Sequence, residues 1–180
     1  TYAKHGIDLC GDVGRQNILL SPAQEHFFAD AIRQAVGLCR NDGRTGEPDI
    51  IITALDDKEL ECKLTSRHRS GAISFQSDFE TLQNKGSLDY LYVIADQNFE
   101  KFAVLHFLGL TIEDFRSLSN GARGKVAMFK HKGMKKCNVL LGNVASLNSR
   151  HIKRLNEKLR TPCAAYKKKR MLKSLEYWKN

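Results

Sequence analysis

Two acidic residues and a lysine stand at a spacing that could build a site for phosphate chemistry. Asp49 follows Pro48 and opens an apolar run, and after eleven intervening residues the chain reads Glu61-Cys62-Lys63. Carboxylates on adjacent strands can bind a divalent cation, and Mg²⁺ is the one that keeps several waters and takes further ligands from phosphate. A lysine beside them can neutralise charge that develops on a reacting phosphate. These residues predict metal-assisted attack of water on a phosphate ester.

Two strands joined by a turn would bring these side chains together. Residues 49–54 include three consecutive isoleucines, which is typical of a strand in a sheet covered on both faces. Residues 55–58 read as a turn, and residues 59–65 alternate between polar and apolar side chains. The sequence therefore predicts a hairpin that carries the two acids and the lysine on its polar face.

The register of this hairpin decides which residues oppose one another. A turn centred on Leu55 places Asp49 opposite Glu61, whereas a turn centred on Asp56 places Asp49 opposite Lys63. Directly opposed residues share a face of the sheet, so either register gathers the three groups. Two carboxylates at that separation repel each other unless a cation neutralises them. Both registers therefore predict a divalent metal site.

Two further groups could serve this metal. The main-chain carbonyl of Cys62 is available because its side chain points away from the acids. Glu25 shares a helical face with Phe28 and Ile32, an odd place for an unpaired acid. Its carboxylate either reaches the metal or its waters, or makes a favourable contact with the helix dipole. Lys63 has three alternative tasks: orienting the water, lowering the pKa of that water, or neutralising charge on the phosphate.

A helix before the hairpin has marked ends. Ser21 is a candidate cap, Pro22 stands at the first helical position, and Gln24 completes a capping box. Gly37 is a signal for the other end, so the helix is expected to run to about Leu38.

The remaining elements predict a single domain over residues 1–180. A length of 180 residues with 42% hydrophobic composition is enough for one compact core. Residues 75–84 and 99–108 read as helices on either side of a strong strand at 88–95, and a helical crossover permits that strand to pair in parallel. The expected class is α/β, with a mixed central β-sheet flanked by helices.

Positive charge is concentrated late in the chain. Residues 1–120 hold 12 Lys/Arg against 18 Asp/Glu, whereas residues 121–180 hold 17 against 2. This block argues for a polyanionic partner, nucleic acid first and anionic membrane second; the plain alternative is a basic solvated face. Short strands are predicted at 125–130 and 137–141, and a charged helix at 149–159. The candidates for DNA binding here are Arg123, Lys125, Lys130, Lys132, Lys135, Lys136, Asn148, Arg150, Lys153 and Arg154.

Two arginines also follow the second strand of the hairpin. Arg67 and Arg69 would touch phosphates flanking the reacting one or reach a base edge, and the alternative is an ordinary solvated loop. His68 between them is a weaker candidate for a general base, because a two-carboxylate metal site already activates water.

The cysteines and the hydropathy pattern exclude several other classes. Five cysteines without a C-x-x-C pair argue against a zinc site or a disulfide framework and indicate reduced thiols in a cytoplasmic protein. No apolar run reaches 18 residues and no signal peptide is visible, so no membrane-spanning segment is expected, and DNA rather than a membrane is the expected partner.

Pro48-Asp49, eleven residues and then Glu61-Cys62-Lys63 resembles the motif of the PD-(D/E)xK nuclease superfamily and, within it, of the type II restriction endonucleases. The resemblance covers about residues 21–108, which would form a restriction endonuclease-like core, with a basic DNA-binding portion at about 121–180. It implies Mg²⁺-dependent hydrolysis of double-stranded DNA at a specific short sequence, with Mn²⁺ as a substitute, leaving 5′-phosphate and 3′-hydroxyl ends. Asp49 and Glu61 would be metal ligands and Lys63 the catalytic lysine. A homodimer on a symmetric site is expected.

Two alternatives remain beside this reading. A chain of 180 residues is small for a restriction enzyme, which leaves room for a structure-specific nuclease such as a Holliday junction resolvase or a repair endonuclease. A non-catalytic basic nucleic-acid-binding protein, in which the acidic pair is incidental, belongs to a different class.

Overall fold

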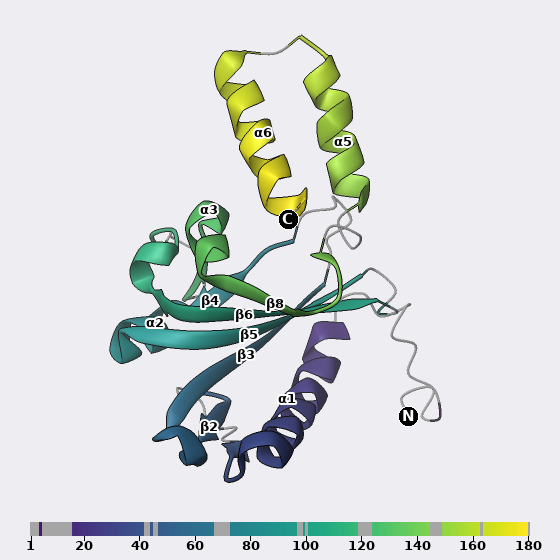
Figure 1. The fold of residues 1–180 in the computed structure, drawn as a ribbon. Coiled ribbons are helices and arrows are strands. Elements are labelled where there is room, and N and C mark those ends of the chain that lie inside the picture. Colours follow the sequence, from purple (N-terminus) through teal and green to yellow (C-terminus); the bar gives the residue numbers. More distant parts are fainter. Residues whose placement is uncertain are drawn as a thin grey trace.

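A mixed β-sheet organises the chain in the computed structural model (Figure 1). The structure describes residues 4, 16–41, 44, 47–66, 73–96, 99, 101–118, 124–144, 149–162 and 164–179. Within these residues the sheet has six strands in the order β1-β2-β3-β5-β6-β8. Their bounds are β1 (Arg40–Asn41), β2 (Ile50–Ile52), β3 (Lys58–Ser66), β5 (Ser87–Ala95), β6 (Phe102–Thr111) and β8 (Cys137–Leu141). Strands β3 and β5 are parallel and the other neighbours are antiparallel, so the predicted α/β class with a mixed central sheet is confirmed.

Helix α1 (Gln16–Val36) begins earlier than predicted. The expected start at Ser21 is wrong, because the helix is already formed at Gln16 and Pro22 lies inside it. The Ser21 hydroxyl instead donates a hydrogen bond to Oε1 of Glu25, one turn further on, at 3.1 Å. A proline in a helix interior removes one main-chain hydrogen bond. Contacts of the helix with the sheet outweigh this local signal, as they commonly outweigh propensity.

The end of α1 follows the prediction, and its packing face does so in part, because Val36, which the period of Phe28 and Ile32 also places on that face, is 44% exposed. Phe28 and Ile32 pack against the core on this side of the sheet, and α1 lies across strands β1, β2 and β3 (Figure 1). The helix ends at Val36. Gly37 has a φ of +100°, which glycine adopts readily, and its N–H donates to the Arg33 carbonyl at 3.1 Å.

The predicted hairpin forms with a shorter first strand. Only Ile50–Ile52 are extended, and residues Thr53–Leu55 make a 3₁₀ turn where the strand was expected to continue. Asp56 and Asp57 then both adopt φ of 54°, a left-handed conformation that aspartate tolerates better than most residues. The turn therefore lies where the sequence places it, and β3 spans the predicted alternating segment.

The segment after β3 differs from the prediction at its start. Residues 75–84 were expected to be helical, but Gln76–Asp78 form strand β4, which pairs with β7 (Lys125–Ala127) in a separate two-stranded sheet. Helix α2 (Phe79–Lys85) follows, and Oδ1 of Asp78 caps it by accepting from the Thr81 N–H at 3.2 Å. The chain then enters β5 parallel to β3, as the predicted crossover requires.

The predicted helix at 99–108 is wrong. Residues 102–108 of this segment belong to strand β6, which pairs antiparallel with β5. Ala103, Leu105 and Phe107 are buried on one face and Val104 on the other. A strand covered on both faces reads as a continuous apolar run, which periodicity alone does not separate from a buried helix.

The sheet separates two cores, and a helical pair projects beyond it. Ile50, Leu60 and Cys62 face α1, whereas Phe75 and Tyr92 belong to the core on the opposite face. Helices α5 (Ser149–Arg160) and α6 (Ala165–Lys179) pack against each other as an arm that extends away from the sheet, and α6 touches α3 (Lys130–Gly133) at its base (Figure 1). The predicted charged helix and the strand at 137–141 are confirmed, and the predicted strand at 125–130 is β7, three residues long.

Across the described residues, no helix has both the length and the apolar character that a bilayer requires.

Candidate active site

The register of the β2–β3 hairpin brings the predicted acids together. Ile50 lies opposite Leu60, which centres the hairpin on residue 55. One step further, the same register places Asp49 opposite Glu61, the first of the two predicted arrangements. Lys63 follows on the same face of β3, and its ammonium forms an ion pair with the Glu61 carboxylate.

Asp49 also caps the main chain of β3. Pairing between β2 and β3 extends to Leu60 within the described residues, and beyond it Oδ2 of Asp49 accepts a hydrogen bond from the Cys62 N–H at 2.7 Å. In a strand, the N–H and C=O of one residue point toward the same neighbouring strand. The Cys62 carbonyl therefore points toward the side on which Asp49 lies, as a main-chain metal ligand would need to.

The side chain of Cys62 lies elsewhere. It is 2% exposed in the core beneath α1. Burial raises the pKa of the thiol well above its usual value, and nearby acidic residues, Asp49 first, raise it further. The thiol stays neutral, which leaves the main-chain oxygen as the only ligand that this residue can offer.

Glu61 has an unsatisfied oxygen in the interior. Glu61 is 6% exposed, and its Oε1 accepts a hydrogen bond from the Lys63 ammonium. The other oxygen, Oε2, is buried with no hydrogen-bond partner among the described residues. Burial raises the pKa of the Glu61 carboxyl, the charge of Lys63 opposes that change, and repulsion from Asp49 adds to it. A buried polar atom without a partner is costly, so a cation at Oε2 would remove a real penalty.

Asp49 experiences a similar environment. Burial raises the pKa of its carboxyl, while Lys63 and the Cys62 N–H hold it down, and the nearby charge of Glu25 raises it again. The two acids therefore carry their negative charge at a cost in the metal-free protein. Binding a divalent cation would offset that cost.

Lys63 keeps its proton in this surrounding. Burial alone would lower the pKa of its ammonium, but the charges of Glu61 and Asp49 prevail and raise it. A protonated lysine is a hydrogen-bond donor and a positive charge, and it is not a base.

A cavity of about 690 Å³ lies beside these groups. Its walls come from three directions: the exposed end of β3, one face of α1, and the small β4–β7 sheet. Among the predicted residues, it is lined by Glu25, Asp49, Cys62, Lys63 and Lys125.

Several other lining residues were not predicted. Asn17 and Ser21 precede the predicted Glu25 in steps of four residues on α1, and the three form a polar stripe that faces the cavity. That period of four was visible in the sequence. Gln76–Asp78 on β4 form another wall, and this one had no such signal because the segment reads as helix.

The number of acidic ligands is small. No cluster of three or more His, Cys, Asp and Glu side chains arranged to hold a metal occurs in the described part of the chain. A cation at this site would depend on Asp49 and Glu61, the Cys62 carbonyl, and water. That set suits Mg²⁺, which commonly uses one or two carboxylates and retains several waters.

The predicted DNA-binding residues fall into distinct groups. Lys125 lines the cavity, and Lys135 and Lys153 are exposed. Lys132 is exposed but donates to the Glu113 carbonyl at 2.7 Å. Burial, with a smaller contribution from Arg116, lowers the pKa of Lys130 to about 8. Arg150 and Arg154 lie on α5, and Arg67, Arg69, Arg123 and Asn148 lie outside the described residues.

Lys136 has a structural partner. Its ammonium lies 2.7 Å from Oδ2 of Asp114, which is buried, and 3.0 Å from the Gly109 carbonyl. Burial tends to raise the pKa of the Asp114 carboxyl, but hydrogen bonds from Lys136 and from Thr111 outweigh it and leave that pKa below its usual value. This lysine was a DNA-binding candidate, and its ion pair points to stability instead.

Lys136→Met is therefore expected to lower the free energy of unfolding by about 1–3 kcal/mol at neutral pH, because Asp114 is left buried without its cation. The pKa of Asp114 is depressed in the folded state, so this stabilisation is present above the usual aspartate pKa and lost as the pH falls through the depressed value. Urea unfolding at pH 7 and near pH 3 should show the penalty shrinking in acid. The matched control is Lys135→Met at an exposed neighbouring position. Equal stability of the two variants would contradict this role.

Comparisons with known proteins do not add to this geometry. No protein-family model matches the chain, and no curated protein or solved structure matches it. A proposal for its function therefore depends on Asp49 and Lys63, which line the cavity, and on the buried Glu61 beside them.

Proposed function

We propose that this protein is a Mg²⁺-dependent endonuclease that hydrolyses phosphodiester bonds of double-stranded DNA at a short specific sequence, in the manner of type II restriction enzymes of the PD-(D/E)xK superfamily. The observation that carries the proposal is the pairing of Asp49 with Glu61 beside Lys63, with one Glu61 oxygen buried and unpartnered. A helix before the hairpin and a parallel crossover after it are compatible with a restriction endonuclease-like core.

The ligands available suit Mg²⁺, with Mn²⁺ as a substitute. Asp49 uses one oxygen for the Cys62 N–H, and Glu61 offers Oε2. The Cys62 carbonyl would be the third protein ligand, and Glu25 on the cavity wall would hold a water of the cation. A bound Mg²⁺ would polarise the phosphate and lower the pKa of a coordinated water.

Lys63 would act as a positive charge. Because its pKa is raised, it is protonated at neutral pH and cannot accept the proton of the attacking water. A protonated ammonium is compatible with all three of its alternative tasks: orienting the water, lowering the pKa of that water, and neutralising charge on the phosphate. Lys125 lines the same cavity from β7 and would contact the substrate backbone.

Two copies of the chain would be needed to cut both strands of a symmetric site in one encounter. A homodimer with twofold symmetry matches the symmetry of such a sequence, so we include it in the proposal. We also place the activity in the cytoplasm, since free buried thiols such as Cys39 and Cys62 suit a reducing compartment.

Digestion of a mixed-sequence plasmid with Mg²⁺ tests the proposal. The expected result is a set of discrete bands that disappears when EDTA replaces the metal. Sequencing of the fragment ends would then identify the recognised bases and the stagger of the cut. Cleavage of branched DNA alone would favour a junction or repair nuclease. Binding without cleavage of any DNA, in Mg²⁺ or Mn²⁺, would leave a non-catalytic nucleic-acid-binding protein.

A further inference from the structure

The net charge of the protein resides in the arm. Residues 149–180, which include α5 and α6, hold 11 Lys/Arg against 2 Asp/Glu. The other 148 residues hold 18 of each, so their formal net charge is zero. The entire +9 of the chain therefore belongs to these two helices and their ends, a sharper division than the basic final third visible in the sequence.

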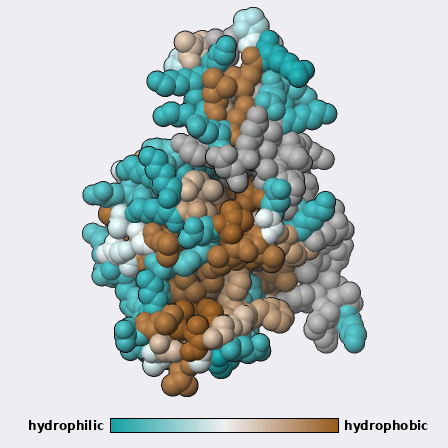
Figure 2. All heavy atoms as spheres, viewed as in Figure 1, coloured by the Kyte–Doolittle hydropathy of each residue, from teal (hydrophilic) through white to brown (hydrophobic). Residues whose placement is uncertain are grey.

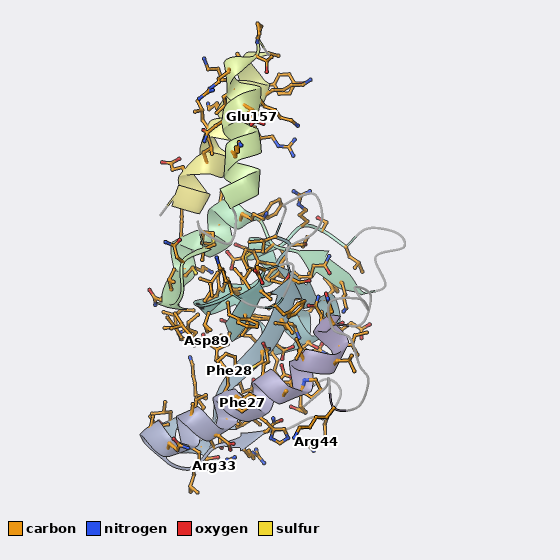
Figure 3. The ribbon with its side chains drawn as sticks, turned by 90° about the vertical axis from the view of Figure 1, so that its right-hand side faces the viewer. Phe27, Phe28, Arg33, Arg44, Asp89 and Glu157 are labelled. Carbon is orange, nitrogen blue, oxygen red and sulfur yellow. The ribbon has the colours of Figure 1, made fainter. Side chains whose placement is uncertain are left out.

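The arm displays this charge to solvent. Figure 2 shows hydrophilic residues along both flanks of the arm, with a narrow apolar strip between the helices. On α6, Lys168, Lys169, Arg170 and Lys173 are exposed, and none of them forms an ion pair with a described residue. Glu157 lies far out on α5, away from the sheet (Figure 3).

The body of the protein, which is the part before residue 149, uses some of its cations differently from the arm. Lys58 pairs with buried Asp89 at 3.1 Å, and Lys85 pairs with Glu59 at 2.6 Å. Such pairs leave less charge for an external anion. The arm differs from the body in its excess of cations, because residues 149–180 hold 11 Lys/Arg against 2 Asp/Glu.

The arm is also held in place. Leu175 on α6 is buried, and α6 contacts α3 at the edge of the body. A fixed basic projection can present its charges to a large partner without ordering a loop first, which keeps the entropic cost of binding low.

The distribution of charge around α6 favours nucleic acid over a membrane. Residues 167–170 are four consecutive basic residues, and successive helical residues are turned by about 100°, so they cover every side of the helix. A helix that lies in a membrane interface needs one broad apolar face. A duplex presents phosphates along both of its strands, so a helix that lies against it meets negative charge on more than one side. Lysines and arginines bind these phosphates whatever the base sequence is.

We infer that the α5–α6 arm is a binding module for the phosphate backbone of a nucleic acid duplex, separate from the electrically neutral body that carries the candidate active site. The inference rests on the proposed function for the role of the duplex as substrate, but binding by the arm requires neither the metal nor Lys63.

The test is duplex binding by the full-length protein in EDTA, with a 20-bp duplex of mixed sequence as probe. Lys169→Gln/Lys173→Gln removes two charges four residues apart on α6, and Arg40→Gln/Lys101→Gln removes two exposed charges from the body as the matched control. The arm variant should bind on the order of tenfold more weakly at about 0.1 M salt, and the slope of log affinity against log salt should fall by about 1.8. The body variant should bind as the parent does.

The outcomes separate this inference from the nuclease proposal. Arm-dependent binding in a protein that cleaves no DNA would support the inference and count against the nuclease. Equal losses in the two variants, or no loss in the arm variant, would overturn the inference whatever the cleavage result. A parallel measurement uses phosphatidylserine vesicles as the probe. If the arm variant loses vesicle binding but keeps its affinity for the duplex, the inference is overturned in favour of a membrane surface.

Discussion

Lys63→Met, Asp49→Asn and Glu61→Gln are each expected to lower the rate of Mg²⁺-dependent cleavage by roughly 10³-fold or more while leaving duplex affinity in EDTA nearly unchanged. Asp49 and Glu61 supply the carboxylates on which a cation would depend, since the described part of the chain offers no larger cluster of ligands. Lys63 supplies the charge beside them. The measurement is single-turnover cleavage of a duplex that contains the mapped site, together with binding in EDTA.

Glu59→Gln is the matched control for this series. Glu59 lies two residues before Glu61 and on the same face of β3, but its partner is Lys85 at 2.6 Å, whereas Glu61 pairs with Lys63 beside Asp49. Its amide variant should cleave at the parental rate. Cleavage that persists in the Asp49 variant, or that falls equally in the Glu59 variant, would remove the basis of the proposed site.

The candidate site could be predicted because its spacing is local. The two acids and the lysine lie within a single hairpin, and the alternation of residues 59–65 already assigns Glu61 and Lys63 to one face. The sequence left two registers open, and the turn decided between them. Asp56 and Asp57 take left-handed conformations after a 3₁₀ turn, which centres the hairpin on residue 55.

Elements that depend on distant partners could not be predicted. Strand β4 pairs with β7, almost fifty residues later in the chain, and the local hydrophobic pattern of neither segment indicates that pairing. Strand β6 carries apolar residues on both faces, including Leu108 at 46% exposure, and therefore lacks the alternation that identifies β3. The start of α1 was missed because Ser21 and Pro22 form a strong local signal for a helix terminus, and tertiary contacts of the helix override it.

The roles of charged residues were also only partly predictable from the sequence. Counting residues places a basic block after position 120, but it does not separate lysines that hold the fold from lysines that face solvent. Lys136 belongs to the first kind through Asp114, and Lys169 and Lys173 belong to the second. The structure shows that the cations of residues 149–180 stand on a separate pair of helices, whereas the described cations of residues 121–148 belong to the body.

Phe75→Ala is expected to lower the free energy of unfolding by about 3–5 kcal/mol. Phe75 is 1% exposed, and its ring meets Tyr92 at a centroid distance of 5.0 Å and Phe107 at 5.4 Å, both edge to face. Removing the ring leaves a cavity and loses these contacts. Urea unfolding followed by circular dichroism measures the change.

The control is Phe27→Ala on α1, where the side chain is 74% exposed, so the same substitution should change stability by less than about 0.5 kcal/mol. Phe75 also supports the cavity, because its neighbour Tyr92 lines it and donates a hydrogen bond to the Gln76 carbonyl at 2.6 Å. Loss of Phe75 should therefore make any cleavage activity more sensitive to temperature than the parent, before global unfolding begins. A Phe75 variant as stable as the Phe27 variant would show that the core on this face of the sheet is not packed as described, and that β4 does not hold the cavity wall.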